Sequence, residues 1–374
     1  MHIKRRNKLI QTLNDHVHEK DKTENKSVIL FKPENNFYLT NFWGEGITII
    51  SQNDLKTKLI VPKLEYTRAK NTSKECDVIS SERGINLINT TMDQIRENDM
   101  ILSDSNDFDI LNKIQKKASK KNEIDGNDLL YKLREIKDIE EIEKIKKASS
   151  IIDKLFEIAK NEIKENMTEV QLQAILVYEA MKLGARFPPY QYTSNPLIIA
   201  SGANGSFPHA ESSIKQFKKG ELIVLDLTLS FDHYISDATR TFGLGEITNE
   251  MKNVYEIVKK SQLKGIQQIN QTDDLSNVDL ICRNNIENEG YGEYFIHSTG
   301  HGIGLEVHEP PWVRPNFKSN IKQNMAITIE PGIYIENEFG VRIEDSILIT
   351  NKIKEGVGFG YNILHSYTKD LTIL

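Results

Sequence analysis

Charged residues stand inside stretches of this sequence that otherwise have the composition of buried β-strands. Asp226 lies in the run LIVLDLTL, in which every other residue except one threonine is aliphatic. An ionised carboxylate in a buried strand needs a cation or hydrogen-bond donors to compensate for its lost hydration. We therefore expect a cation beside Asp226, with a hydrogen-bonded structural aspartate as the open alternative.

A second aspartate follows at a spacing typical of a hairpin. Asp237, in YISDATRTFG, comes eleven residues after Asp226, and their midpoint lies between Phe231 and Asp232 in turn-like sequence. An antiparallel hairpin centred there makes the two aspartates cross-strand neighbours on one face, roughly 4.5–5.5 Å apart at Cβ. Because two such carboxylates repel each other, the pattern predicts a divalent cation between them.

A similar arrangement recurs nearer the C-terminus. Glu330 in AITIEPG and Glu344 in GVRIEDS are centred on Asn337, in the turn-like segment ENEFG. A hairpin there presents a second carboxylate pair, although Glu344 has an ion pair with Arg342 as its alternative. Together the two hairpins resemble the halves of a pseudo-symmetric site.

A histidine completes the pattern. His301 lies in HSTGHGIGLEVHE, where the neighbouring glycines are expected to let the backbone approach a ligand closely. Four carboxylates and one imidazole suit a pair of divalent ions such as Mn, Co, Fe or Zn. Two such ions ~3.5–4 Å apart bridge a water, lower its pKa and hold the attacking and leaving groups. The pattern therefore predicts hydrolytic chemistry.

Composition excludes several other classes of protein. The 374 residues suit two ordinary domains, and no apolar run approaches the ~18–20 residues of a membrane span. A net charge of −6, with basic residues spread along the chain, argues against nucleic acid as a partner. The N-terminus lacks an apolar stretch for secretion, and two isolated cysteines, Cys76 and Cys282, predict no disulfide framework. The cytoplasm is the expected compartment.

The pattern along the chain changes near 130–137. Before it we expect a small mixed α/β domain with β-rich runs at 27–32, 46–51 and 59–61, a turn at Asn53-Asp54, and a solvated Lys-rich segment at 112–127. After it, the pairs Asp138/Glu141 and Thr168/Gln171 are capping boxes that begin helices, and Gly184 ends the second one. Further helices are expected at 250–269 and 277–289, with β-rich runs at 221–230, 325–330 and 341–350.

Six motifs in order resemble the creatinase/prolidase/methionine aminopeptidase superfamily, and most closely its Xaa-Pro dipeptidases and aminopeptidases. They are ASGANGSFPHA, VLDLTL, ISDATRTF, STGHGIGLEVHEPP, ITIEPGIY and VRIEDSILIT. The resemblance covers nearly the whole chain. It implies an α/β (α+β) fold, with a creatinase-like N-terminal domain at 1–136 and a pseudo-symmetric pita-bread catalytic domain at 137–374.

The resemblance also implies roles for individual residues. Asp226 and Asp237 bind one metal, His301 and Glu330 bind the other, and Asp237 and Glu344 bridge both. The metals implied are divalent, with Mn or Co favoured. The residues expected to act on the substrate or the reacting water are His209, His308, Glu330 and Arg342, where Arg342 orients Glu344 or a substrate carboxylate. Thr239 is expected to support an aspartate ligand, and His297 to lie just outside the ligands.

The sequence departs from the family pattern at two places. Leu-Thr-Leu follows Asp226, where many relatives have glycine two residues after the aspartate. The segment 188–196, PPYQYTSNP, is longer or more polar than the usual link and is expected to border the substrate pocket.

The function implied is metal-dependent hydrolysis of Xaa-Pro bonds in dipeptides or short peptides by a homodimer. Two alternatives stay open at this point: a creatinase-like hydrolase of a non-peptide C–N bond, and a non-catalytic binding member of the fold. The first is disfavoured because the family's metal-free branch lacks ligands that stand here, and the second because such members lose ligands or substrate histidines. Methionine aminopeptidase is disfavoured by the additional N-terminal domain.

Overall fold

The computed structural model describes residues 2–16, 26–52, 57–96, 99–117, 126–189, 193, 195–353 and 356–374. The chain divides into two compact units, Met1–Arg134 and Glu135–Leu374. Each unit has its own sheets and its own hydrophobic core. We therefore describe them separately.

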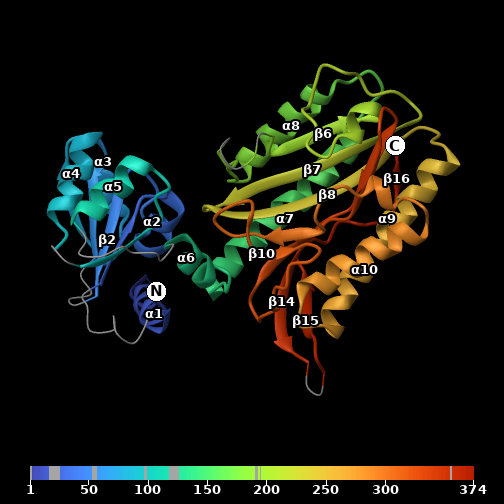
Figure 1. Cartoon of the computed structure of the whole chain (residues 1–374). Helices are drawn as coiled ribbons and strands as arrows, with labels where there is room; N and C mark the ends of the chain where they lie inside the picture. Colours follow the sequence, from blue (N-terminus) through green and yellow to red (C-terminus); the bar gives the residue numbers. More distant parts are fainter. Residues whose placement is uncertain are drawn as a thin grey trace. The chain divides into compact units, whose positions relative to one another are not determined.

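The first unit is a five-stranded mixed sheet with helices around it (Figure 1). The strands run in the order β4-β3-β2-β1-β5, in which the β1/β2 and β2/β3 pairs are antiparallel and the β3/β4 and β1/β5 pairs are parallel. The elements are α1 (His2–His16), β1 (Lys26–Leu30), α2 (Pro33–Thr40), β2 (Ile47–Ser51), β3 (Thr57–Pro62), α3 (Lys63–Thr72), β4 (Asp77–Ser81), α4 (Ile85–Asp93), β5 (Met100–Ser103), α5 (Phe108–Lys117) and α6 (Gly126–Arg134).

The three strands expected in this unit are present as β1, β2 and β3. The antiparallel pairing of β2 with β3 agrees with a hairpin, but its turn at Asn53-Asp54 lies outside the described residues. The segment 112–127, expected to be solvated and weakly patterned, is helical at residues 112–117 and 126–127, although residues 112–117 other than Ile114 are exposed or half-buried, as expected. These residues belong to α5 and α6, because Ile114 packs into the sheet's core while the lysines of α5 lie on its outer side. Residues 118–125 lie outside the described residues.

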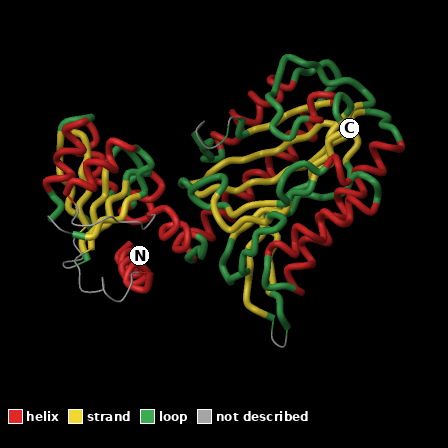
Figure 2. The backbone as a smooth tube through the Cα atoms, viewed as in Figure 1, coloured by secondary structure: helices red, strands yellow, loops and turns green. Residues whose placement is uncertain are grey.

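The second unit combines two pairs of long helices with sheets that are antiparallel except for the β8/β16 pair (Figures 1 and 2). Its helices are α7 (Ile139–Glu162), α8 (Glu169–Lys182), η2 (Gly202–Ser206), α9 (Asn249–Gln268), η3 (Ile269–Gln271), α10 (Leu275–Asn288) and η4 (Gly292–Tyr294). Its strands are β6 (Leu197–Ser201), β7 (Glu221–Phe231), β8 (Tyr234–Leu244), β9 (Gly300–Gly302), β10 (Glu309–Val313), β11 (Ala326–Ile329), β12 (Gly332–Ile335), β13 (Phe339–Arg342), β14 (Asp345–Lys352), β15 (Phe359–Ile363) and β16 (Thr372–Ile373).

The helix starts follow the sequence signals. Asp138 and Glu141 form the reciprocal capping box of α7, and Thr168 and Gln171 form that of α8. Both pairs satisfy backbone N–H groups that the first turn of a helix leaves without an acceptor. Gly184, at φ +89°, follows α8 in the left-handed conformation that glycine adopts without strain.

Two cores divide the second unit into halves. Helices α7 and α8 pack with β6, β7 and β8 around Leu155 and Phe242, whereas α9 and α10 pack with β11, β13 and β14 around Val258 and Ile347. Each half thus pairs two helices with the strands of one acidic hairpin. This arrangement places the hairpins between the two helix pairs.

The first hairpin has a register different from the expected one. Asp226 pairs with Thr239, and Thr228 pairs with Asp237. The aspartates are therefore diagonal neighbours on one face, rather than directly opposite each other. The turn lies one residue later than expected because Asp232 and His233 both adopt positive φ, 46° and 71°, and form a two-residue connection.

The second hairpin is centred as expected. β12 pairs with β13 so that Gly332 lies opposite Arg342, and β11 pairs with β14 so that Ile329 lies opposite Asp345. Both pairings share the centre Asn337, which lies in the left-handed region at φ 63°. The expected run at 341–350 is interrupted at residues 343–344, so Glu344 stands between two strands.

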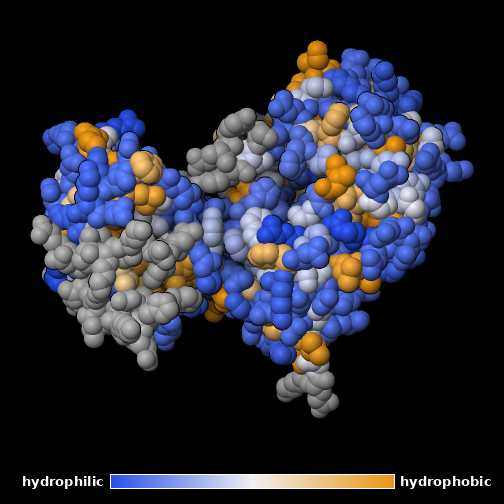
Figure 3. Space-filling model, viewed as in Figure 1, coloured by the Kyte–Doolittle hydropathy of each residue, from blue (hydrophilic) through white to orange (hydrophobic). Residues whose placement is uncertain are grey.

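Hydrophilic residues cover most of the described surface on the face shown in Figure 3. Among the described helices, none combines the length and hydrophobicity that crossing a bilayer requires.

Candidate metal centre

Acidic residues and a histidine from five strands and the segments next to them line one pocket of about 190 Å³. All five predicted ligands line it, together with the predicted substrate-contacting residues His209, His308 and Arg342, as well as His297. Thr193 and Asn195, two of the described residues of the divergent segment 188–196, also line it, so this part of the segment borders the pocket as expected.

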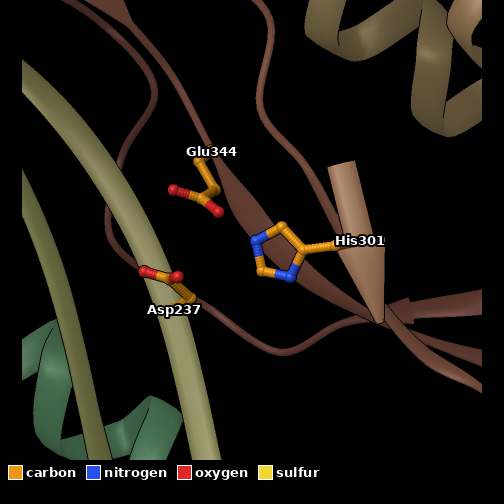
Figure 4. A group of neighbouring side chains, drawn as sticks. All are labelled: Asp237, His301 and Glu344. Carbon is orange, nitrogen blue, oxygen red and sulfur yellow. The ribbon is translucent and has the colours of Figure 1, made fainter. Parts of the chain in front are cut away.

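Three of the predicted ligands form a compact group. Asp237, His301 and Glu344 are buried, and one ligand atom from each lies within 4.8 Å of the other two. Figure 4 shows the two carboxylates and the imidazole turned toward one another. Glu330 adjoins this group, with its Oε1 3.5 Å from Nε2 of His301. Asp226 lies on the same face of β7 and β8 as Asp237.

The imidazole of His301 is prepared to bind a metal through Nε2. Its Nδ1 lies 3.0 Å from the carbonyl oxygen of Gly302, to which it donates as Nδ1–H, and this leaves Nε2 as the lone-pair donor. Burial, together with the neighbouring His308, lowers the pKa of His301 to about 3. The ring is therefore neutral at neutral pH, as a metal ligand must be.

The glycines around His301 serve a different purpose from the expected one. A Cβ on Gly300 would lie 2.0 Å from the carbonyl oxygen of Thr328, and one on Gly302 would lie 2.5 Å from that of Pro310. At Gly304 it would meet the carboxylate of Glu309. The expectation of close approach to a ligand was therefore wrong, because the space is taken by neighbouring protein atoms.

In two of the carboxylates, only one of the two oxygens has a partner among the described residues. Oδ2 of Asp226 pairs with Arg342, while its Oδ1 is buried without a hydrogen-bond partner among the described residues. Oε2 of Glu344 accepts the hydroxyl of Thr239 at 2.6 Å, and its Oε1 is likewise buried and unpartnered in that part of the chain. Buried carboxylate oxygens without donors are costly, and a cation satisfies them.

The expected supporting contact of Thr239 needs correction. Thr239 supports Glu344 rather than an aspartate, and the threonine that supports an aspartate is Thr228, whose hydroxyl donates to Oδ1 of Asp237 at 2.9 Å. Thr228 occupies the position where the sequence departs from the family pattern. Its alternation with Asp226 along β7 is the signal that places it on the metal-facing side.

Arg342 is the hub of a buried hydrogen-bond network. Its Nη2 lies 2.5 Å from Asp226, its Nη1 donates to the hydroxyl of Tyr334 at 2.5 Å, and its Nε donates to Thr239 at 3.1 Å. The Tyr334 hydroxyl lies 2.9 Å from Nε2 of His297. His297 thus lies outside the ligands, as expected, whereas the role of Tyr334 was not expected from the sequence.

The carboxylates carry more negative charge than the protein neutralises. Burial, followed by the charges of neighbouring acidic groups, raises the pKa of Asp237 and of Glu344 well above the ordinary value. Burial and the charge of Asp226 raise the pKa of Glu330 to about 8, although Arg342 opposes the shift. Such a cluster is stable in its ionised form only with additional positive charge. The donor set of four carboxylates and one neutral imidazole fits divalent cations.

His308 lies at the rim of this cluster. It is exposed, and its ring centroid lies 4.4 Å from that of His301. The loop before it is fixed by Glu309, whose carboxylate accepts the backbone N–H of Glu306 and forms a buried ion pair with Lys137 at 3.0 Å. The loop therefore presents an imidazole beside the metal-facing residues.

Comparison with known proteins identifies relatives of both units. Residues 143–351 match the model of metallopeptidase family M24, and residues 5–136 match that of the creatinase/prolidase N-terminal domain. A protein named Xaa-Pro dipeptidase from Pyrococcus horikoshii is 36% identical over 88% of this chain and 92% of its own length.

Solved structures agree with these matches. The prolidase from Pyrococcus horikoshii superposes with a TM-score of 0.85 at 33% identity, covering 98% of this chain and 99% of that one. The X-Pro aminopeptidase from Thermotoga maritima superposes with a TM-score of 0.79 at 29% identity, covering 93% and 97%. The fold class expected from the sequence is confirmed.

Proposed function

The chain belongs to metallopeptidase family M24, and on this basis we propose that it hydrolyses the Xaa-Pro bond of dipeptides or short peptides with the aid of two divalent metal ions. The observation that carries the proposal is the pocket in which five metal-binding side chains meet three candidate substrate-binding residues. The names of the similar proteins, Xaa-Pro dipeptidase and prolidase, support this substrate class.

Each ligand has a proposed place. Asp226 and Asp237 hold one ion, His301 and Glu330 hold the other, and Asp237 and Glu344 are shared between them. The buried, unpartnered oxygens of Asp226 and Glu344 support this assignment. Oxygen-rich donors favour Mn or Co, with Fe and Zn also compatible. When bound, such ions lower the pKa of a water molecule and polarise the peptide carbonyl.

The chain's own residues supply proton transfer and orientation. The pKa of Glu330, raised to about 8 by burial and by Asp226, suits a carboxylate that accepts a proton near neutral pH. His209 and His308 both line the pocket, where imidazole N–H groups stabilise a developing oxyanion or protonate the leaving nitrogen. Arg342 orients Asp226 by direct contact, and Thr239 orients Glu344.

Assembly and location stay predictions. We propose a homodimer in the cytoplasm with no nucleic-acid partner, on the basis of the family resemblance, the net charge of −6 and the scarcity of cysteine. Light scattering coupled to size-exclusion chromatography measures the first of these directly, and a mass of one chain would contradict it.

The test is hydrolysis of Ala-Pro, Leu-Pro and an Ala-Pro-Ala tripeptide by metal-stripped protein before and after addition of Mn or Co. We expect cleavage only after metal addition, and none in Asp237→Asn. A preference for the dipeptides indicates a dipeptidase, whereas a preference for the tripeptide indicates an aminopeptidase.

Matched controls separate the alternatives. Asp273→Asn, at an exposed aspartate that does not line the pocket, is expected to retain activity. Metal binding without cleavage of any Xaa-Pro peptide would favour a hydrolase of a non-peptide C–N bond. Absence of metal binding would contradict the proposed mechanism as a whole.

A further inference from the structure

A groove of about 590 Å³ adjoins the metal pocket. His297 and Ser298 line both cavities, so the two adjoin at this segment. The groove's other walls come from the segments around Phe295 and around Phe317. Two arginines and one histidine line it, and no described aspartate or glutamate does. Its charge therefore suits a negatively charged ligand.

Arg314 follows the last residue of β10, and its guanidinium lies near the ring of Trp312. Trp312 lies opposite His301 in the β9/β10 pair, and it also lines the metal pocket. Arg314 follows Trp312 by two residues, and side chains two residues apart in an extended chain point to the same face, about 7 Å apart. A peptide residue spans about half that distance, so a group one or two residues from the reacting bond reaches Arg314.

Aromatic rings hold the guanidinium of Arg314 in place. Its Cζ lies 4.2 Å from the ring centroid of Phe317 and 5.9 Å from that of Trp312. Contacts with ring faces restrict the guanidinium and leave its N–H edges able to bind a carboxylate with two hydrogen bonds. Preorganisation of this kind lowers the entropic cost of binding.

Of the two arginines that line the groove, Arg314 is the one whose charge no described carboxylate balances. Arg283 forms an ion pair with Asp279 at 2.9 Å, and Arg342, in the adjoining pocket, pairs with Asp226. Arg314 is exposed, and within the described part of the chain it forms no ion pair. Its side chain thus has aromatic support but no anionic partner.

We propose that this groove is a subsite for a substrate carboxylate and that Arg314 binds it, so that the enzyme prefers acidic peptides. The groove's apolar walls, Ile296 at 64% and Phe317 at 39% exposure, suit the methylene groups of a glutamate side chain. The carboxylate is that of an acidic side chain in the residue before proline. The inference rests on the proposed function, which supplies the peptide substrate.

The experiment measures hydrolysis of Glu-Pro, of its uncharged isostere Gln-Pro, and of Gln-Pro-amide. Each peptide is tested with the metal-loaded wild type and with Arg314→Gln, Arg314→Lys and Lys182→Gln. Lys182, whose side chain is 53% exposed on α8, is the matched loss of one positive charge outside the groove. We expect kcat/KM for Glu-Pro to exceed that for Gln-Pro by about tenfold or more, as a charge-assisted hydrogen bond allows.

The variants locate the source of the carboxylate. Loss of the Glu-Pro preference in Arg314→Gln, with Gln-Pro unchanged within about twofold, assigns the groove to the side chain. An equal loss for Glu-Pro and Gln-Pro, with Gln-Pro-amide unaffected, overturns the proposal, because Arg314 then binds the C-terminal carboxylate instead. Arg314→Lys retains part of the Glu-Pro preference, because a lysine keeps the charge but not the paired donors. Unchanged ratios in Arg314→Gln, or an equal change in Lys182→Gln, overturn the proposal.

A binding measurement separates this proposal from the proposed function. The chain has two tryptophans, so a Trp43→Phe background leaves Trp312 as the fluorescent reporter beside Arg314. In metal-free protein we expect Glu-Pro to quench it at about tenfold lower concentration than Gln-Pro, and Arg314→Gln to remove the difference. If this difference in quenching is observed but no peptide is hydrolysed, only the proposed function is contradicted. Hydrolysis without charge preference, and equal quenching by both peptides, contradicts only the Arg314 subsite.

Discussion

The guanidinium of Arg342 contacts the carboxylate of Asp226, with Nη2 2.5 Å from Oδ2, and reaches Glu344 only through the hydroxyl of Thr239. The arginine therefore fixes one oxygen of Asp226 and leaves Oδ1 buried without a hydrogen-bond partner among the described residues. This contact sets the orientation of a proposed metal ligand and balances part of its charge.

Arg342→Lys is expected to weaken metal binding. Lysine keeps the positive charge but loses the fixed geometry that joins Asp226, Tyr334 and Thr239. Loss of a residue that orients a ligand costs about 10- to 100-fold in metal affinity. Competition with a fluorescent chelator measures this, with Arg83→Lys as a control outside the pocket. An unchanged metal affinity in Arg342→Lys would show that the network does not position Asp226.

Thr228 is expected to tune the metal site through its hydroxyl. Thr228→Val keeps the shape of the side chain but removes the hydrogen bond to Oδ1 of Asp237, whereas Thr228→Ser keeps the bond. We expect about a tenfold loss of metal affinity in the valine variant and nearly full retention in the serine variant. The chelator assay distinguishes them, and equal losses in both variants would assign Thr228 to packing alone.

Metal binding at pH 7 is expected to release protons. In the metal-free protein, burial and neighbouring carboxylates raise the pKa of Asp237 and Glu344 well above the ordinary value, and burial and Asp226 raise that of Glu330 to about 8. Glu330 is therefore largely protonated at pH 7 before the metal binds and must ionise to coordinate it. Calorimetry in buffers of different ionisation enthalpy measures the protons released, and buffer-independent heats would contradict the expectation.

The same raised pKa values determine how the stability of the metal-free protein varies with pH. A carboxyl group whose pKa is higher in the folded state stabilises the fold less as pH rises from its unfolded pKa toward its folded pKa. Because the lowered pKa of His301 changes stability in the opposite direction up to the unfolded histidine pKa near 6.5, the metal-free protein should become less stable mainly between about pH 7 and pH 8. The increase in melting temperature on metal addition should be larger at pH 8 than at pH 6. A smaller increase in melting temperature at pH 8 than at pH 6 would contradict this expectation.

Asp153 provides a stability test away from the metal ligands. Burial would raise its pKa, but His365, whose Nδ1 lies 3.4 Å from Oδ1, and hydrogen bonds from Ser366 outweigh burial and lower it to about 2. Its contribution to stability is present above the unfolded pKa near 4 and is lost as pH falls toward 2. Asp153→Asn should lose up to about 2 kcal/mol of unfolding free energy at pH 7. It should also lose less stability than the wild type between pH 4 and pH 2.

Urea unfolding at several pH values measures this contribution. Asp273→Asn, at an exposed position in the same unit, is the control and should unfold as the wild type does. A stability difference between Asp153→Asn and the wild type that does not shrink below pH 4 would contradict the assigned hydrogen bonds.

Local signals predicted the helices well. The capping boxes at Asp138 and Thr168 begin α7 and α8 because they satisfy backbone groups within one turn of the chain. The helix α5 was missed, although Ile110, Leu111 and Ile114 recur at helical spacing, because its C-terminal half is rich in lysine. A lysine-rich helix end is therefore easily mistaken for a solvated segment.

Contacts between distant strands were predicted less completely. The order of the motifs identified the family, but the offset between Asp226 and Asp237 depends on positive φ at Asp232 and His233, which lack the usual Asn-Gly signal of such turns. Likewise, the nearby Glu344 in the sequence did not indicate that Arg342 pairs with Asp226. That partner is set by the packing of β13 against β7, which joins residues 116 positions apart.

The most direct test of the account is the joint titration of metal and activity. Metal-stripped protein receives Mn in steps while bound metal and Ala-Pro hydrolysis are measured on the same samples. We predict that activity rises with bound metal to about two ions per chain and that Asp237→Asn, which alters the shared ligand, neither retains both ions nor cleaves the peptide. Full hydrolysis by stripped protein, or by Asp237→Asn, would contradict the account.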